Sequence, residues 1–195
     1  MQEEKVIKIG KKHNGVITTK ECAMQRIHNQ TLHRLLSKKI IEKISHGIYL
    51  LTEYLEDDHY LFQLRYPKTI FSYETALYLI HETDFLPINF DVSVTKGYKF
   101  NDKENIRVNY VSDELADLGK IKVKTMFNND VYVYCYERVL CDLIKNRKKA
   151  NLETYVNAIK RYAQYKNKNL DLLYEIAKKM NILDEMKNIM IGIIY

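Results

Sequence analysis

The chain has 195 residues, of which 46% are apolar and 29% charged, with only 6 Gly and 2 Pro. This composition is typical of a globular protein with a substantial core, and it excludes collagen-like, linker-dominated and disordered chains. The N-terminal Met1-Gln2-Glu3-Glu4-Lys5 leads into no apolar signal core, no run of about 18 apolar residues occurs, and the three cysteines form no paired framework. We therefore expect a protein of the reducing cytoplasm that is neither secreted nor inserted in a membrane.

Positive charge is concentrated in the first quarter of the chain. Residues 1–51 hold ten Lys and Arg against four Asp and Glu, whereas residues 52–195 hold 21 of each kind. A basic module beside a neutral body is typical of a polyanion-binding head, although many proteins carry a basic surface without any nucleic-acid role. We expect two domains, residues 1–51 and residues 52–195.

The first domain begins with three short helical patterns. Residues 3–13 carry apolar side chains on one side and lysines elsewhere, which predicts an amphipathic helix. Asn14-Gly15 is expected to end it, because both residues tolerate the left-handed conformation. After a short apolar link, Thr18-Thr19 offers the N-cap of a second helix. Asn29 is expected to cap a third helix over residues 29–38.

A hairpin completes the first domain. The third helix places Leu32, Leu35 and Leu36 on its core face and polar side chains on the other. Residues 41–44 and 48–51 then flank Ser45-His46-Gly47, a pattern that predicts a β-hairpin. Three short helices followed by a hairpin predict a winged helix-turn-helix.

The expected DNA-reading elements are the third helix and the hairpin. A helix fits the major groove of B-form DNA, where base edges present a unique pattern of donors and acceptors. The hairpin tip would lie along the DNA backbone or minor groove, where its contacts fix the orientation of the protein more than they select a base sequence. The alternatives are that these polar side chains only solvate a surface helix, or that the domain mediates protein contacts. The predicted DNA-binding residues are Thr19, His28, Asn29, Gln30, Thr31, His33, Arg34, Lys38, Lys43, Ser45 and His46.

Residues 52–195 predict a mixed α/β domain with a small sheet and C-terminal helices, so the whole chain is expected to be α+β. Helices are expected at residues 57–65 and 73–81, and strands at 90–95, 106–111, 120–126 and 131–134. From residue 136 the apolar period becomes helical, with stripes along residues 152–163 and 170–180 and an apolar end at 186–195 that docks on them. These stripes predict core, not a cofactor site.

Sequence patterns for chemistry are few. The chain contains no HExxH, no His/Cys pairs at zinc spacing, and no phosphate-loop, dinucleotide or nucleophile-elbow pattern. A nuclease would need an acidic residue followed by an E-x-K pair on a strand, and the segment 91–96 lacks the second acid. Cys135 and Cys141 have no neighbouring ligands, which favours buried apolar side chains over a metal site. We expect a binding protein that is not an enzyme and needs no cofactor or metal.

Several phrases occur in a characteristic order along residues 5–165. They are Ile27-x4-Leu32-x2-Leu35 with Ile41-x5-Gly47-Ile48-Tyr49-Leu50, then YPKTIFSYETALYL (66–79), VTKGY (94–98) and YERVLCDLI (136–144). Their order resembles that of the AbiEi-type antitoxins of abortive-infection systems. Lys39 departs from the family pattern, in which glycine would follow the recognition helix, and this puts the C-terminal turn of that helix in doubt.

The resemblance implies a bicistronic partner of a nucleotidyltransferase-like toxin. It implies that the N-terminal domain binds inverted repeats in the promoter of its own operon and represses it, and that the C-terminal domain neutralises the toxin. The family is classed as type IV, in which antitoxin and toxin need not form a stable complex. We expect a monomer in solution, with cooperative binding on DNA left open. The alternative is a winged-helix transcription regulator whose body senses a ligand or partner, with no toxin.

A second basic stretch lies at residues 145–168, with eight Lys and Arg against one acid. Solvated charge and capping of a helix C-terminus explain it without any function. The alternative is a second polyanion surface, used against the RNA or nucleotide substrate of the toxin or against its acidic face. The candidate antitoxin surface comprises Lys145, Arg147, Lys148, Lys149, Lys160 and Arg161.

Overall fold

The computed structural model describes residues 2–100, 104–148 and 150–194. The fold is α+β, as predicted, and the chain divides into two compact units. The first unit comprises Met1–Pro67 with Lys124–Val131, and the second comprises Lys68–Val123 with Tyr132–Tyr195. Residues 52–67, which the sequence assigns to the second domain, belong by their contacts to the first unit.

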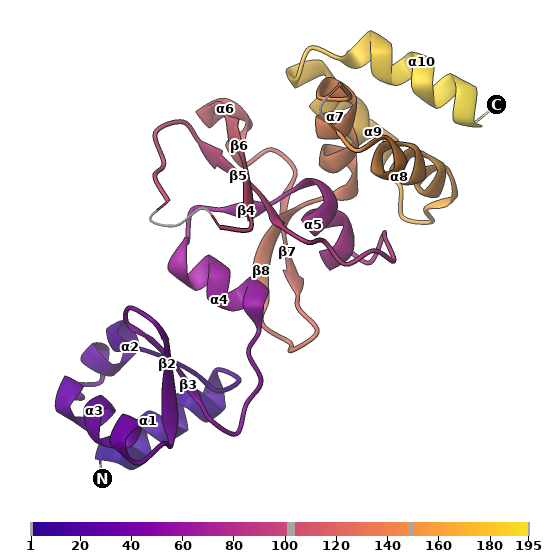
Figure 1. The fold of residues 1–195 in the computed structure, drawn as a ribbon. Helices are drawn as coiled ribbons and strands as arrows, with labels where there is room; N and C mark the ends of the chain where they lie inside the picture. The colour runs from indigo at the N-terminus through magenta and orange to yellow at the C-terminus, as the bar shows by residue number, and fades with distance from the viewer. Residues whose placement is uncertain (1, 101–103, 149, 195) are drawn as a thin grey trace. The chain divides into compact units, whose positions relative to one another are not determined.

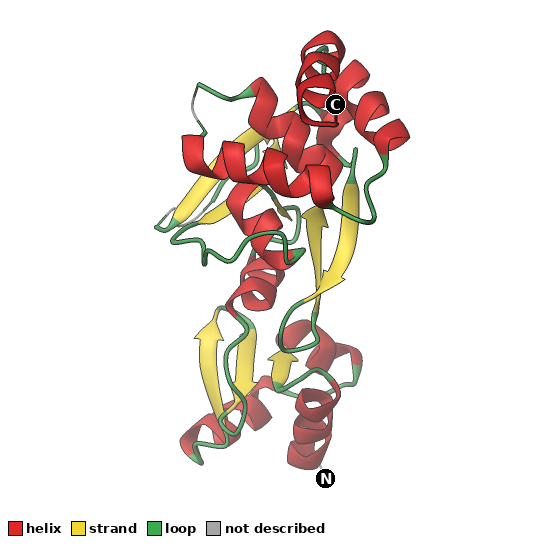
Figure 2. Ribbon diagram, turned by 90° about the vertical axis from the view of Figure 1, so that its right-hand side faces the viewer, coloured by secondary structure: helices red, strands yellow, loops and turns green. Residues whose placement is uncertain are grey.

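The first unit is a winged helix-turn-helix (Figure 1). The three predicted helices and the hairpin are confirmed, and the link at residues 16–18 is a strand that pairs antiparallel with the second strand of the hairpin. Figure 2 shows the strands of this unit in yellow beside its helices. The elements are α1 (Gln2–Lys12), β1 (Val16–Thr18), α2 (Thr19–Met24), α3 (Asn29–Ser37), β2 (Ile41–Ser45) and β3 (Ile48–Leu51), with sheet order β1-β3-β2.

An apolar core holds the three helices against the sheet. Val6 and Ile9 of α1, Leu32 and Leu35 of α3 and strand residues such as Leu51 form one buried cluster. Gly10 lets α1 approach β3 closely, because a Cβ there would lie 2.6 Å from Leu51 Cδ1. The helix face predicted from the apolar period is therefore the face that packs.

The ends of the helices differ from expectation at α3. Thr18 caps α2 as predicted, since its side chain accepts a hydrogen bond from the Glu21 amide. Asn29, in contrast, is the first residue of α3 and not its cap, and His28 stands at the N-cap position without a capping bond from its side chain. After α3, Lys39 has a φ of 55°. This is the left-handed region that glycine occupies most easily, so the Cβ of Lys39 makes this turn strained.

A polar group, the Asp57 cluster, lies beside helix α4 (Asp58–Arg65) in the first unit and comprises the buried Asp57, Thr125 and Asn129 with the half-buried Asn14. Asp57 Oδ1 accepts from the Tyr60 amide and caps α4. Its Oδ2 accepts from Thr125 Oγ1 at 2.5 Å and from Asn129 Nδ2 at 2.8 Å. Asn129 Oδ1 in turn accepts from Asn14 Nδ2 at 2.8 Å. The turn at residues 125–129 is thus bonded into the first unit.

The second unit is built on a five-stranded sheet of order β6-β5-β4-β8-β7. Strand β5 runs parallel to β6 and antiparallel to β4, and β4 runs parallel to β8. The four predicted strands are confirmed, although β7 ends at Lys124 and not at residue 126, and the short β4 is additional. The strands are β4 (Ile70–Phe71), β5 (Phe90–Thr95), β6 (Ile106–Val111), β7 (Lys120–Lys124) and β8 (Asp130–Tyr134).

Helices accompany this sheet, and the last four gather into one group (Figure 1). Within the described residues no helix is both long and apolar enough to cross a bilayer. Helix α7 is the most deeply buried, because all of its residues from Tyr136 to Ile144 lie in the interior. The helices are α5 (Tyr73–Leu79), α6 (Asp113–Ala116), α7 (Tyr136–Lys145), α8 (Leu152–Gln164), α9 (Leu170–Lys179) and α10 (Leu183–Ile194).

Candidate nucleic-acid interface

The hairpin turn and the start of α2 are joined by direct contacts. The Thr19 amide donates to the Gly47 carbonyl at 2.9 Å. Gly47 has a φ of +75°, and a Cβ there would lie 2.8 Å from Thr19 Oγ1. The turn can therefore close against α2 in this way only with glycine, and it brings Ser45 and His46 close to Thr19.

Helix α3 presents a polar outer face. Leu32 and Leu35 anchor its inner face in the core. All but one of the side chains that the sequence places outward are exposed. The exposed ones are His28, Asn29, Gln30, His33, Arg34 and Lys38. Amides, imidazole and guanidinium at these positions can donate to and accept from base edges or phosphates.

Thr31 is the exception, and its predicted outward position is wrong. Its side chain is fully buried, and its Oγ1 donates to Gln2 Oε1 at 2.8 Å. Thr31 stands four residues before Leu35, so it lies on the same buried face of α3, here toward α1. Thr31 therefore packs α3 against α1 and presents nothing to a ligand.

An acidic side chain on α1 holds the cations at the end of α3. Glu3 Oε2 accepts from Lys38 Nζ at 2.8 Å, and Glu3 Oε1 lies 3.9 Å from Arg34 Nε. The hydrogen bond from Lys38 lowers the pKa of the Glu3 carboxyl, so this group is ionised at neutral pH. Arg34 remains 58% exposed. Exposed pairs of this kind are weak, so a DNA phosphate can compete for both cations.

The hairpin supplies further polar groups. Lys43 and His46 are exposed and Ser45 is half-buried. The pairing of β2 with β3 shifts register between Lys43 and Ser45. A shift of this kind re-aims side chains at the edge of a sheet, here next to the turn.

Two exposed cations near this face were not among the predicted residues. Lys20 lies in the first turn of α2, and Arg26 lies in the turn between α2 and α3 with a φ of 56°. The turn 25–28 between two predicted helices was the signal in the sequence, because the turn of a helix-turn-helix lies next to the start of the recognition helix.

The basic stretch of the second unit is largely engaged by its own neighbours. Lys145 Nζ donates to the Met180 carbonyl at 3.2 Å. Arg147 forms an ion pair with Glu185, and Arg161 forms one with Asp84. Three of the six candidate antitoxin residues are thus bonded to neighbouring groups of the second unit. This is what we expect if the basic stretch has only a structural role. Lys148 and Lys160 are exposed, and Lys149 lies outside the described residues.

The interface offers cations and hydrogen-bonding groups. In the described part of the chain no three His, Cys, Asp or Glu side chains are arranged to hold a metal ion. No family model matches the sequence, and no curated protein matches it either. The function must therefore be inferred from the side chains that the two units present.

Proposed function

We propose that this chain is the antitoxin of a type IV toxin–antitoxin system and that it represses its own operon by binding promoter DNA. The observation that supports DNA binding is the outer face of α3, where Asn29, Gln30, His33 and Arg34 are exposed on a helix anchored by a leucine face. Gln and Asn pair with adenine through two hydrogen bonds, and Arg pairs with guanine in the same way. The whole net charge of +6 lies in residues 1–51 around this face.

The proposed partner on DNA is an inverted repeat in the promoter of the operon. Each half-site would take one copy of the winged domain, with α3 in the major groove and the hairpin on the adjacent backbone. The protein itself would be monomeric before it binds.

The test of repression is a gel shift of the full chain on its own promoter fragment at several salt concentrations. We expect the promoter to be bound at least about a thousandfold more tightly than unrelated DNA, which is the lower end for specific DNA-binding proteins. Equal affinity for both fragments at every salt concentration would contradict the proposal.

The antitoxin activity is proposed for the second unit, with a nucleotidyltransferase-like toxin as functional partner and no stable complex between them. Its support is the order of the family-like phrases, which continue through residues 66–79, 94–98 and 136–144. Such a protein works in the cytoplasm, and Cys22, Cys135 and Cys141 are buried free thiols.

The test of antitoxin activity is co-expression with the product of the adjacent reading frame, scored by growth. Rescue without co-elution of the two proteins supports the type IV arrangement. The exposed pair Lys148 and Lys160 separates the two interpretations of the basic stretch. If this surface opposes the toxin, changing both to Glu abolishes rescue while operator binding persists; unchanged rescue by the folded variant would show that the charges are only solvated.

The alternative function is a winged-helix transcription regulator whose body senses a small ligand. The observation that favours it is a cavity of about 580 Å³ within the second unit. A neighbouring gene that encodes no toxin, together with repression that a small molecule relieves, would replace the antitoxin proposal with this one.

A further inference from the structure

The cavity of about 580 Å³ lies on the face of strands β5 and β6, beside α5, α7 and the start of α8. Its deepest side chains include Asp91, Ser93, Arg138 and Asp142, all of them buried. Its outer side chains are exposed and include Lys96, Arg107 and Asn151. A recess of this size whose floor is charged is unusual, because charged side chains seldom lie in the interior.

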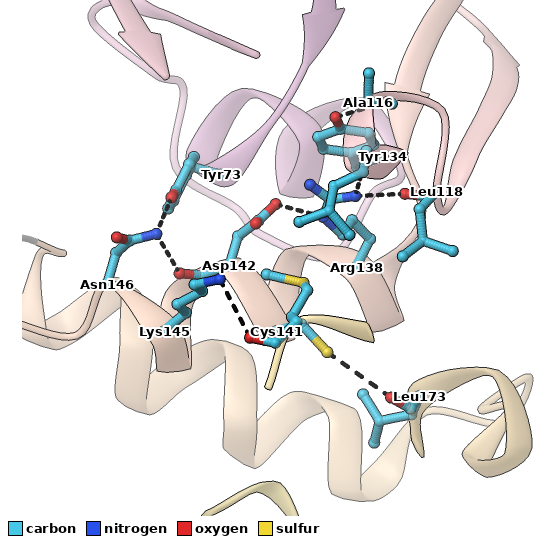
Figure 3. Close-up of polar contacts among 12 residues, drawn as sticks. Tyr73, Ala116, Leu118, Tyr134, Arg138, Cys141, Asp142, Lys145, Asn146 and Leu173 are labelled. Carbon is cyan, nitrogen blue, oxygen red and sulfur yellow. Dashed lines mark hydrogen bonds and ion pairs between the residues drawn. The ribbon is translucent and has the colours of Figure 1, made fainter. Parts of the chain in front are cut away.

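Arg138 is the central charged group of the floor, and it is fully buried (Figure 3). Its Nε donates to Asp142 Oδ2 at 3.0 Å, and its Nη1 donates to the carbonyls of Leu115 and Leu118 at 2.6 and 2.7 Å. The guanidinium lies 4.2 Å from the ring centroid of Tyr134. Nη2 is buried without a hydrogen-bond partner among the described residues. The guanidinium is held in place while part of its hydrogen-bonding capacity is unused.

Asp91 is the second such group. Its Oδ1 lies 3.0 Å from Arg107 Nε, and Arg107 Nη2 also donates to Glu74 at 2.7 Å. Asp91 Oδ2 is buried without a partner within the described part of the chain. Burial raises the pKa of the Asp91 carboxyl to about 7 against the pull of Arg107, so at neutral pH this oxygen can donate as well as accept. An unsatisfied buried polar atom costs about 1–3 kcal/mol, so a donor and an acceptor kept beside one cavity are typical of a binding site.

The exposed side of the cavity carries cations and amides. Lys96 is exposed, and Arg107 keeps 48% of its side chain exposed while it holds the two acids. Asn109 of β6 pairs with Ser93 of β5 and lies on the same face of the sheet as Asp91 and Arg107, so its amide faces the cavity. Two other lining amides are partly engaged, because Asn146 Nδ2 donates to Tyr73 Oη and to the Asp142 carbonyl, and Asn151 Oδ1 caps α8.

We propose that this cavity binds a small organic phosphate of mononucleotide size. The cations Lys96 and Arg107 match a phosphate, and the Asn109 amide together with the unpartnered Arg138 Nη2 and Asp91 Oδ2 matches the hydrogen-bonding edge of a heterocyclic base. The volume lies within the range of sites for small organic ligands and is far larger than an inorganic anion needs. This site is separate from the DNA-binding face and does not depend on the proposed repression.

The test is isothermal titration calorimetry of the full chain with AMP, GMP, CMP and UMP, with their nucleosides, and with inorganic phosphate. We expect one nucleotide to bind with a stoichiometry of one. Its nucleoside and phosphate alone should each bind at least about tenfold more weakly, because each engages only one part of the site.

Three variants locate the binding. Lys96→Gln removes the exposed cation, and Asn109→Trp fills the cavity from β6; each should weaken binding at least about tenfold. Lys178→Gln is the matched control, because this exposed lysine of α9 does not line the cavity. Circular dichroism and the urea midpoint show which variants are folded, and two different cavity variants keep the test decisive if one of them is not.

The outcomes are distinct. No binding of any nucleotide, equal binding of phosphate alone, or binding unchanged in both folded cavity variants would each overturn the proposal. Nucleotide binding lost on Arg34→Ala but kept on Lys96→Gln would place the ligand on the DNA-binding face and would also overturn it. Promoter binding is measured separately, so failure of the ligand site and failure of repression are told apart.

Discussion

Helices α3 and α7 have nearly the same length, 9 and 10 residues, yet they place their polar side chains in opposite environments. Helix α3 buries only Thr31, Leu32 and Leu35, so its cations lie in water with one loose acidic partner. Helix α7 buries Glu137, Arg138 and Asp142 along with its apolar residues. Exposed charges contribute little to the free energy of unfolding, so they can be used to bind a ligand without loss of stability. Buried charges must be matched atom by atom, so they determine stability first.

The largest expected effect tests the buried side of this comparison. Arg138→Met leaves Asp142 buried without its cation and leaves the carbonyls of Leu115 and Leu118 without their donor. We expect a loss of about 3–5 kcal/mol in the free energy of unfolding, because an uncompensated buried charge remains. Urea unfolding followed by circular dichroism measures it.

The matched control removes both charges. In the double variant Arg138→Met/Asp142→Leu no charge of this pair stays buried, so we expect it to be more stable than Arg138→Met alone. A double variant at least as unstable as the single one would mean that packing, and not charge, sets the requirement at these positions.

The pH dependence of stability is the next largest effect, and it depends on Asp91. Its pKa in the folded protein is about 7, above the ordinary value of 3.8, so the native state binds the proton more tightly than the unfolded chain. The stabilisation is complete below about pH 4 and is lost as the pH rises through about 7, by up to about 4 kcal/mol. Asp91→Asn should remove the contribution of Asp91 and leave the smaller fall from Asp142, whose pKa burial raises to about 6, whereas the exposed Glu114→Gln should retain both. Urea unfolding between about pH 4 and 8 gives both curves.

Substitutions on the outer face of α3 are expected to weaken DNA binding and to leave the free energy of unfolding nearly unchanged. Arg34→Ala or Gln30→Ala should lower the affinity for the operator by about 1–3 kcal/mol if each reads a base, with the urea midpoint nearly unchanged. Thr31→Val should do the reverse, because it breaks the buried bond to Gln2 and leaves the outer face intact. Gel-shift titrations beside unfolding curves compare the three, and loss of affinity in Thr31→Val alone would contradict the assigned face.

The hairpin should show a sequence-independent effect. Lys43→Ala should weaken binding to all sequences alike and reduce the slope of log affinity against log salt by about one unit. The control is Glu42→Gln on the same exposed segment of β2, which removes a negative charge and should leave that slope unchanged. An effect of Lys43→Ala confined to the promoter would mean that this lysine reads a base.

The smallest expected effect is at the end of α3. Lys39→Gly should raise the free energy of unfolding by about 1 kcal/mol, because glycine adopts a φ of 55° without the strain that a Cβ brings. Lys38→Gly, one residue earlier in an ordinary right-handed conformation, should lower it. Unfolding curves of the two variants decide whether the left-handed turn stores this strain.

Much of the fold could be predicted because most helices and strands are long enough to show a regular spacing of apolar residues. The bounds of β5 and β6 agree with the prediction to the residue, since β-branched runs between polar loops define strands without help from the rest of the chain. Strand β4 was missed because two residues, Ile70 and Phe71, are too short for any period to be visible. Its position between β5 and β8 depends on long-range pairing that local sequence does not encode.

Of the two candidate sites, the α3 face could be predicted from a local pattern and the cavity could not. The outward residues of α3 followed from the helical period, but Thr31 was wrongly placed outward, because it stands four residues before Leu35 and so shares the buried face. The cavity could not be predicted, because Asp91 and Arg107 meet across neighbouring strands. Arg138 and Asp142 stand at i,i+4 spacing, which is common on exposed helices as well, so no buried ion pair was predicted there. Only the tertiary packing shows that this pair is buried.

The Asp57 cluster has a consequence for how the protein acquires its structure during synthesis. Asp57 and Thr125 are 68 positions apart, so the capping carboxylate of α4 leaves the ribosome long before its partners do. At about 5–20 residues per second, several seconds separate the emergence of the winged helix from that of the turn at residues 125–129. During that interval Asp57 can be solvated and α4 can fray. The last bonds of the first unit therefore form only after the chain has passed Asn129, so a unit that includes the N-terminus is complete only when about two thirds of the chain has been made.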